Sequence, residues 1–166
     1  LAFNHGRAPM SDPAFRDALS AMINKEYVTE SLLQGAAFPL YVLLPEGNES
    51  WYNEEVATEL AEAGYAGLDD DTRRATAIGL LTEAGYTWPE GAAPGWYDAE
   101  GGSYSPEPAE GLSYAAASGE IIGPDGEPVQ DLELIHPNAG YDPLRATFGG
   151  YIAGVAREIG IPLSSV

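Results

Sequence analysis

The sequence contains no cysteine, which excludes a disulfide framework, a thiol nucleophile and any metal site built on thiolates. It also lacks a run of about 20 apolar residues, the length that a helix needs to cross a lipid bilayer. No charged and then apolar stretch of the signal-peptide type opens the chain. Because the first residue is Leu1 rather than Met, we expect a processed protein or a segment of a longer one.

Basic residues are scarce. There are 7 Lys and Arg residues against 26 Asp and Glu residues, the net charge is −19, and Lys25 is the only lysine. Such a surface repels phosphate groups, which proteins bind through clusters of Lys and Arg, so we expect neither nucleic acid nor anionic lipid as a partner. Two interpretations of the acid excess stay open: attraction of cationic ligands, or solubility in high salt or an external medium.

Motifs for catalysis and metal binding are missing as well. There is no Gly-x-Ser-x-Gly elbow and no phosphate-binding loop. His5 and His136 are far apart in the sequence and would need acidic partners to hold a metal. Asp69–Asp71 lacks the spacing of a calcium loop and predicts instead the acidic start of a helix that carries Arg73 and Arg74. We therefore expect no enzyme, no metal site and no cofactor.

What the sequence does contain is a set of capped amphipathic helices. Its 166 residues fit one domain, and 45% of them are hydrophobic, which is normal for a folded core. Asp12–Pro13 predicts a helix start, followed by apolar residues at helical spacing. Asn24 predicts a second helix that ends at Gly35. Asp142–Pro143 begins the last helix, which Gly160 ends, and its predicted apolar face consists of Leu144, Phe148, Tyr151, Ile152, Val155 and Ile159.

Two further helices end in the same sequence. Glu59–Tyr65 and Leu80–Tyr86 both finish in Glu-Ala-Gly-Tyr. Two copies are too few for a solenoid, which needs about three or more repeats. The local explanation is that the glycine of each copy takes the left-handed conformation after its helix.

The second half of the chain changes character. Residues 87–118 are rich in Gly, Pro and Ser with scattered aromatics, and we expect an irregular surface insertion there. Glu120–Val129 contains a Pro-Asp-Gly turn between β-branched residues and predicts a β-hairpin. Leu132–Ile135, the last helix and Ile161–Val166 predict a right-handed strand–helix–strand unit. The fold class predicted is α/β.

Several motifs resemble a known family in their order along the chain. They are Phe3-Asn4, the elbow Arg7-Ala8-Pro9, Phe15–Ile23, Asn24-Lys25, Leu80–Tyr86, Asp125-Gly126-Glu127-Pro128 and Ile159-Gly160-Ile161. This pattern resembles the extracellular solute-binding proteins of family 5, the dipeptide- and oligopeptide-binding components of ABC importers. The resemblance implies a partial lobe of a periplasmic-binding-protein type II fold, with helices packed on a small mixed sheet and a β-hairpin.

The resemblance also implies how residues 1–166 are organised. They would form a single partial lobe, with a hinge strand ending at Phe3 and helices in 1–86, the irregular insertion in 87–118, and the hairpin with the strand–helix–strand unit in 119–166. In the family, a loop whose aspartate meets the amino group of the ligand follows the last of these strands. This chain stops at Val166 before such a loop, so we expect residues 1–166 alone to bind ligand weakly or not at all.

The function implied is the capture of peptides or similar small solutes outside the cytoplasmic membrane and their delivery to ABC permease subunits. No chemistry is implied, and attachment to a membrane would require an N-terminal lipid anchor outside this sequence. The candidate ligand-binding residues are Asn4 and Arg7 at the hinge elbow, and Tyr41 in the apolar loop Phe38–Leu44. Asn4 and Arg7 can instead fix the turn by hydrogen bonds to the backbone, and Tyr41 can instead pack in a core.

Two other classes of function stay open from the residues alone. The first is a stand-alone acidic interaction domain that makes contact through the aromatic segment around Trp96 and Tyr97. The second is a hydrolase, which would require a cleft containing carboxyl groups of perturbed pKa. Because 26 acidic residues produce many accidental carboxylate pairs, such pairs do not by themselves favour a hydrolase.

Overall fold

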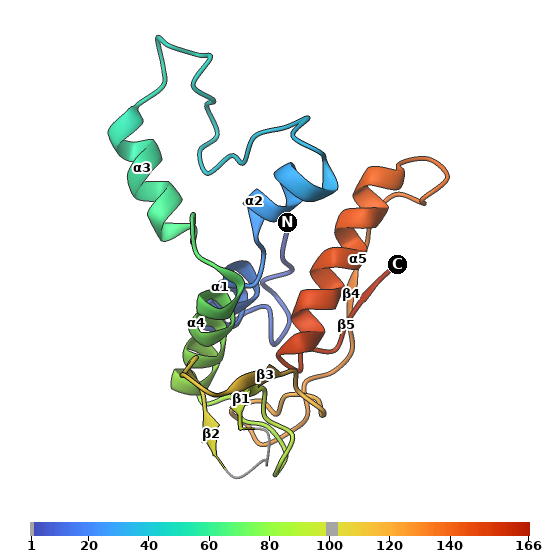
Figure 1. Ribbon diagram of the computed structural model, residues 1–166. Helices are drawn as coiled ribbons and strands as arrows, with labels where there is room; N and C mark the ends of the chain where they lie inside the picture. Colours follow the sequence, from blue (N-terminus) through green and yellow to red (C-terminus); the bar gives the residue numbers. More distant parts are fainter. Residues whose placement is uncertain (1, 99–102) are drawn as a thin grey trace. The chain divides into compact units, whose positions relative to one another are not determined.

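The computed structural model describes residues 2–98 and 103–166, which divide into two units (Figure 1). The larger unit consists of Leu1–Ile23 and Asp71–Val166, and the smaller unit is Asn24–Asp70. Each unit is compact by itself. The organisation of residues 1–166 as a single partial lobe stays a prediction. The predicted hinge strand does not form at Ala2 and Phe3, and Leu1 lies outside the described residues.

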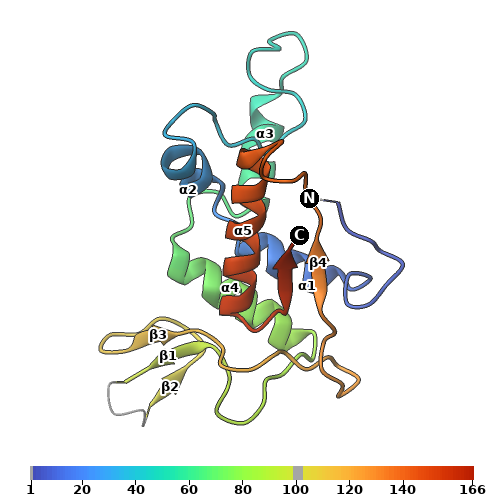
Figure 2. The same ribbon diagram turned by 90° about the vertical axis from the view of Figure 1, so that its right-hand side faces the viewer.

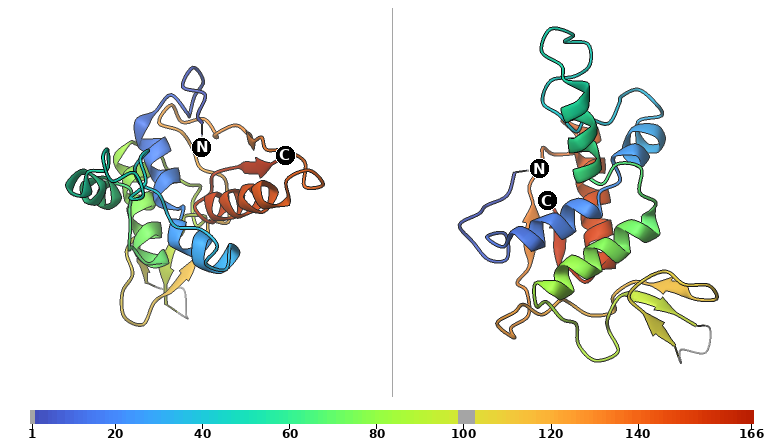
Figure 3. Two further views of the ribbon diagram at one scale, coloured as in Figure 1. Left: turned by 90° about the horizontal axis from the view of Figure 1, so that it is seen from above. Right: turned by 90° about the vertical axis from the view of Figure 1, so that its left-hand side faces the viewer.

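Helices α1, Pro13–Ala21, and α4, Asp70–Glu83, supply much of the core of the larger unit. The carboxylate of Asp12 accepts a hydrogen bond from the Ala14 amide at 2.9 Å, and Pro13 is the first helical residue, as predicted. The two helices lie side by side in the ribbon views (Figures 1 and 3). Their buried residues are Phe15, Ala18, Leu19 and Ala21 of α1, and Arg73, Ala77, Ile78 and Leu81 of α4.

The predicted strand–helix–strand unit is confirmed. Strands β4, Leu132–Leu134, and β5, Leu163–Ser165, pair in parallel, with Leu132 opposite Leu163. Helix α5, Pro143–Glu158, connects them and packs beside β5 (Figure 2). Asp142 caps the helix by accepting from the Arg145 amide at 3.0 Å, and Gly160 follows it with φ +83°.

The predicted apolar face of α5 is confirmed only in part. Of that face, Ile159 just after the helix is buried, Phe148, Tyr151, Ile152 and Val155 are half-buried, and Leu144 is exposed. The buried residues within the helix are instead small, and they are Gly149, Ala153 and Ala156. Large side chains dominate the periodicity of the sequence, but small ones allow the helix backbone to approach the strands closely. The close approach explains why the prediction missed the small residues.

Residues 87–118 contain a three-stranded antiparallel sheet, so the prediction of an irregular segment is wrong there. The strands are β1, Gly95–Tyr97, β2, Tyr104–Ser105, and β3, Ser113–Ala115, in the order β2-β1-β3. Aromatic pairs hold them together: the ring centroids of Trp96 and Tyr114 are 5.1 Å apart, and those of Tyr97 and Tyr104 are 5.0 Å apart. Strands of two or three residues are too short to show an alternating pattern.

At the predicted hairpin, Glu120–Val129, the structure has a tight turn flanked by isolated bridges instead of full strands. Gly126, with φ +84°, lies in a tight turn, and the backbone of Gly123 donates to Glu127 at 2.8 Å. Only isolated bridges flank the turn, one of which pairs Ile122 with Pro128. The α/β class is confirmed, although the strands form two small sheets, one antiparallel and one parallel, rather than one mixed sheet.

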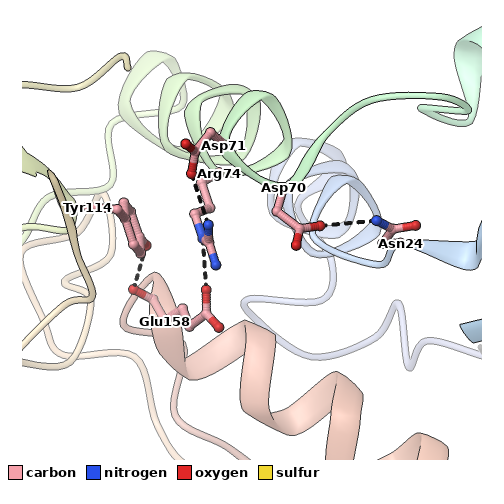
Figure 4. A network of polar contacts seen from close by, with 6 residues as sticks. All are labelled: Asn24, Asp70, Asp71, Arg74, Tyr114 and Glu158. Atoms are coloured by element: carbon pink, nitrogen blue, oxygen red, sulfur yellow. Dashed lines mark hydrogen bonds and ion pairs between the residues drawn. The ribbon is translucent and has the colours of Figure 1, made fainter. Parts of the chain in front are cut away.

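The smaller unit begins at α2, Lys25–Tyr27, which Asn24 caps as predicted by accepting from the Tyr27 amide at 2.9 Å. The helix continues as a π-helical turn over Val28–Leu32, and Gly35 follows with φ +76°. A long irregular loop then leads to α3, Glu54–Ala63. The Asn24 side chain donates to the Asp70 carboxylate at 3.0 Å and so joins the two ends of the unit (Figure 4).

The two Ala-Gly-Tyr helix ends have different conformations. Gly85 after α4 has φ +87°, which confirms the left-handed glycine predicted there. Gly64 after α3 has φ −91°, and the left-handed residue is instead Tyr65, with φ +64°. A Cβ atom at Gly64 would lie 2.8 Å from Cδ1 of Tyr41 and 3.0 Å from the Leu60 carbonyl oxygen. Glycine is required at this position for close packing, not for a positive φ.

Replacing Gly64 with Ala should therefore destabilise the smaller unit by about 1–3 kcal/mol, as overpacking of a close contact does. Gly79→Ala is the matched control, because Gly79 lies inside α4 with open space around its Cα and should gain about 0.5–1 kcal/mol of stability. Hydrogen exchange read peptide by peptide measures both effects, over Asn24–Asp70 for the Gly64 variant and over α4 for the Gly79 variant. Unchanged exchange in the Gly64 variant would show that Tyr41 moves aside without cost.

Candidate binding site at the ends of the parallel strands

Exposed apolar side chains of the larger unit gather where β4 and β5 end. Parallel strands end at the same edge of their sheet, and the crossover helix α5 begins there. Among the described residues of this unit, the exposed large apolar side chains are Ile135, Tyr141, Leu144 and Val166 at this edge, with Tyr104 elsewhere. Ile135 is 79% exposed and Tyr141 is 85% exposed. Ligands of α/β units bind outside the carboxyl ends of the strands, which makes this edge the candidate site.

A histidine fixes the geometry of the edge. Nδ1 of His136 lies 2.8 Å from the Pro137 carbonyl oxygen, and Nε2 lies 2.6 Å from Oγ of Ser165. A carbonyl oxygen only accepts, so Nδ1 carries a proton, and Nε2 is hydrogen-bonded to the Ser165 hydroxyl. Gly149 of α5 packs against both side chains, since a Cβ atom there would lie 2.7 Å from Oγ of Ser165. His136 therefore ties together the end of β4, the end of β5 and α5.

The pair of Ser165 and His136 has the spacing of a nucleophile and its base, but the backbone amides of His136 and Val166 beside it are engaged in the sheet. Acyl transfer requires backbone amides that point at a developing oxyanion. The amides next to this pair are used in the sheet: Val166 donates to Leu134 at 3.0 Å, and His136 donates to Val166 at 3.1 Å. The pair thus acts as a structural clamp.

Asn4 and Arg7 lie in an exposed turn of the larger unit. The side-chain oxygen of Asn4 accepts from the Gly6 amide at 3.2 Å, and its carbonyl accepts from the Arg7 amide at 3.2 Å. The peptide bond between Ala8 and Pro9 is cis. The Asn4 side chain thus makes the contact of the turn-fixing alternative, whereas Arg7 takes part through its backbone amide. A ligand-binding role for Asn4 and Arg7 stays a prediction.

Tyr41 belongs to the smaller unit, so the structure does not bring it together with Asn4 and Arg7. Its hydroxyl donates to the Glu26 carboxylate, and Nζ of Lys25 lies 4.0 Å from its ring centroid. Nζ of Lys25 also donates to the Leu40 carbonyl at 3.0 Å. The ring is half-buried against Gly64. Tyr41 is held by its own unit, and its role toward a ligand also stays a prediction.

Sequence reasoning missed the interactions of Arg74. Its Nε donates to Glu158 of α5 and its Nη1 to Asp71, both at 2.9 Å, and its guanidinium lies 4.5 Å from the ring centroid of Tyr114 (Figure 4). The Tyr114 hydroxyl donates to the Glu158 carbonyl at 3.0 Å. Burial alone would lower the pKa of Arg74, but its contacts with Glu158 and Asp71 outweigh burial and raise it. Only the spacing of Asp71 and Arg74 could have been read from the sequence.

Arg73 was missed as well. It is 2% exposed, and its Nη1 donates to the carbonyls of Ala21 and Ile23, at 3.2 Å each. These carbonyls lie at the end of α1 and just beyond it, where backbone acceptors have no partner within the helix. Arginine is rarely buried, so no sequence signal indicates this role.

Two tyrosines, the buried Tyr86 and the half-buried Tyr114, make the stability of the larger unit sensitive to alkaline pH. Burial raises the pKa of Tyr114, with a smaller contribution from Glu158, and burial followed by the hydrogen bond to Asp12 raises the pKa of Tyr86. Above about pH 10 the unfolded chain loses these protons while the folded chain keeps them. The free energy of unfolding should therefore fall as the pH rises above 10.

Urea unfolding at a series of alkaline pH values measures this fall. The double variant Tyr86→Phe, Tyr114→Phe should be less stable near pH 7, because each lost hydroxyl removes a hydrogen bond worth about 1 kcal/mol. It should nevertheless lose less further stability above pH 10 than the parent chain does. An equal loss in both proteins would exclude these tyrosines as the cause.

Residues 2–98 and 103–166 hold no group of three or more His, Asp or Glu side chains arranged to bind a metal ion. No helix within these residues combines the length and apolar character that a membrane span requires.

Comparison with known proteins gives a consistent match. A profile of the bacterial extracellular solute-binding proteins, family 5 Middle, matches residues 1–164. The probable ABC transporter periplasmic-binding protein SapA of Escherichia coli K12 is 36% identical over 59 residues, which are 36% of this chain and 11% of that protein.

Solved structures show the same fold at low sequence identity. The periplasmic EDTA-binding protein EppA is 21% identical with a TM-score of 0.61, over 98% of this chain and 24% of that one. A periplasmic oligopeptide-binding protein from Thermotoga maritima is 19% identical with a TM-score of 0.61, over 99% and 24% of the two chains. The chain thus spans about a quarter of the length of these structures.

Proposed function

The chain belongs to the bacterial extracellular solute-binding proteins of family 5, and from this premise we propose that the protein captures peptides or similar small solutes outside the cytoplasmic membrane and delivers them to an ABC permease. Capture requires binding and release without chemistry, and two lobes that close on the solute provide both. A stand-alone interaction domain is not favoured, because the family match extends through the aromatic segment on which that alternative rests.

The exposed apolar edge of the β4–β5 unit is the observation that carries the proposal. Its position at the carboxyl ends of parallel strands is where α/β units bind ligands. Tyr141 and Ile135 offer apolar surface there, while His136 and Ser165 keep the edge in one conformation. Asn4 and Arg7 of the larger unit and Tyr41 of the smaller unit remain proposed ligand contacts, on the strength of the family resemblance.

The test is a binding titration of the protein as its gene encodes it, against short peptides and small solutes. Tyr141→Ser should weaken the binding of the solute found by about tenfold or more, as the loss of an aromatic contact does. Tyr104→Ser removes an exposed tyrosine away from the edge and should leave the affinity unchanged.

Two results would contradict the proposal. The first is a folded protein that binds none of the solutes. The second is an equal change in affinity for the solute in the Tyr141→Ser and Tyr104→Ser variants. For residues 1–166 alone we expect weak binding or none, and micromolar affinity of this segment for a peptide would show that the edge suffices by itself.

A further inference from the structure

The smaller unit exposes its large apolar side chains instead of burying them. Every buried apolar residue of the described chain lies in the larger unit, and Thr29 is the one buried residue of Asn24–Asp70. In the loop before α3, Leu43 is 100% exposed, Phe38 is 86% exposed and Trp51 is 78% exposed. Monomeric proteins rarely leave so many large apolar side chains of one segment in water, and such surface marks a contact.

Helix α3 adds exposed apolar side chains on one of its faces to this unit. None of its residues is buried. Val56 and Leu60 lie one turn apart and therefore on the same face, and both are exposed. Helices of this kind are stabilised by an apolar partner along that face.

Acidic residues are interleaved with these apolar side chains. Residues 24–70 contain ten Asp and Glu residues, and their one basic residue is Lys25. The unit therefore carries a net charge of −9, about half of the −19 of the whole chain. Glu46 and Glu49 lie between Leu44 and Trp51, Glu54 and Glu55 begin α3, and all four carboxylates are exposed.

We propose that Asn24–Asp70 binds a polypeptide that combines Lys and Arg residues with large apolar side chains, so that the peptide solute is basic and apolar. The apolar side chains supply affinity by leaving water, and the carboxylates select for positive charge and speed the encounter. Acidic peptides are rejected, because their carboxylates would approach ten others. This inference rests on the proposed function and names its solute class.

Charge distinguishes a basic, apolar peptide from two other possible partners of this surface, a second copy of the chain and a neutral apolar solute. A second copy of the chain would bring a net −9 against a net −9, and repulsion opposes that contact. A neutral apolar solute would leave the carboxylates without a role and would bind equally well at any ionic strength. A basic partner matches both the apolar side chains and the sign of the charge.

Three peptides of equal length and identical Leu, Phe and Trp content test the inference, with Lys, Gln or Glu at the remaining positions. The protein is used as its gene encodes it. The Lys peptide should bind at least about tenfold more tightly than the Gln peptide at low ionic strength, and the Glu peptide most weakly. The preference should shrink as salt is added, since exposed charges are screened.

Two sets of variants assign the preference to this unit. The quadruple variant Glu46→Gln, Glu49→Gln, Glu54→Gln, Glu55→Gln should lose most of the preference for the Lys peptide. The matched control Glu107→Gln, Glu110→Gln, Glu120→Gln, Glu133→Gln removes four exposed carboxylates of the larger unit and should keep it. Trp51→Ser with Leu43→Ser should weaken the Lys and Gln peptides by a similar factor.

Each other outcome overturns the inference. Equal affinity for the three peptides would show that charge plays no part, while leaving peptide capture intact. Equal effects of the two quadruple variants would assign the preference to net charge rather than to this unit. Concentration-dependent dimers that Trp51→Ser abolishes would make a second copy the occupant. Failure to bind any peptide or other solute would overturn the proposed function together with this inference.

Discussion

Replacing Arg73 with Met should lower the free energy of unfolding of the larger unit by about 3 kcal/mol. The guanidinium is 2% exposed and donates to the carbonyls of Ala21 and Ile23 at the end of α1. Methionine keeps the apolar part of the side chain but leaves two acceptors without a donor, and each unsatisfied buried acceptor costs about 1–3 kcal/mol. Urea unfolding followed by circular dichroism measures the loss.

Arg145→Met is the matched control for this substitution. Arg145 is largely exposed and pairs with Asp142 at 3.3 Å in the first turn of α5. Exposed ion pairs contribute about 0–1 kcal/mol, so this variant should remain close to the parent chain. If the two arginine variants lost the same stability, the hydrogen bonds of Arg73 to α1 would not be what holds the larger unit together.

Gly149→Ala should cost about 2–3 kcal/mol, although alanine is the better helix former. The new Cβ atom would overlap the His136 ring and lie 2.7 Å from Oγ of Ser165. A clash inside a helix–sheet contact forces α5 away from β5 or His136 out of its hydrogen bonds. The neighbouring Gly150 has open space, and Gly150→Ala should gain about 0.5–1 kcal/mol.

The expected result is that these two adjacent substitutions change the free energy of unfolding in opposite directions. Thermal unfolding of the three proteins compares their stability, and the NMR signals of the His136 ring report whether its hydrogen bonds to Pro137 and Ser165 persist. A Gly149 variant at least as stable as the Gly150 variant would show that the contact between α5 and His136 is loose.

The helix starts could be predicted because their causes are local. Asp12, Asn24 and Asp142 each cap a helix through an amide two or three residues further on, so a short stretch of sequence contains the whole interaction. The ends were less predictable. Gly64 and Gly85 occupy the same motif, and only the packing of Tyr41, far away in the sequence, distinguishes them.

The missed features all depend on distant partners. The burial of Arg73 follows from the position of α1, and the clamp between His136 and Ser165 follows from the register of two parallel strands. The small sheet in 87–118 depends on aromatic pairs such as Trp96 with Tyr114. The sequence suggested Asn4, Arg7 and Tyr41 as candidates, but the apolar edge at the ends of β4 and β5 required the fold.

The parallel pairing of β4 with β5 has a consequence for the order of folding. Leu132 and Leu163 are roughly 30 residues apart, so pairing them requires the closure of a long loop before any hydrogen bond between the strands forms. The antiparallel β1 and β2 close a much shorter one. A two-stranded sheet is marginal by itself, so β4 and β5 gain stability only when α5 docks in the same step. We therefore expect the apolar edge to assemble late in folding, in the same cooperative step in which α5 docks.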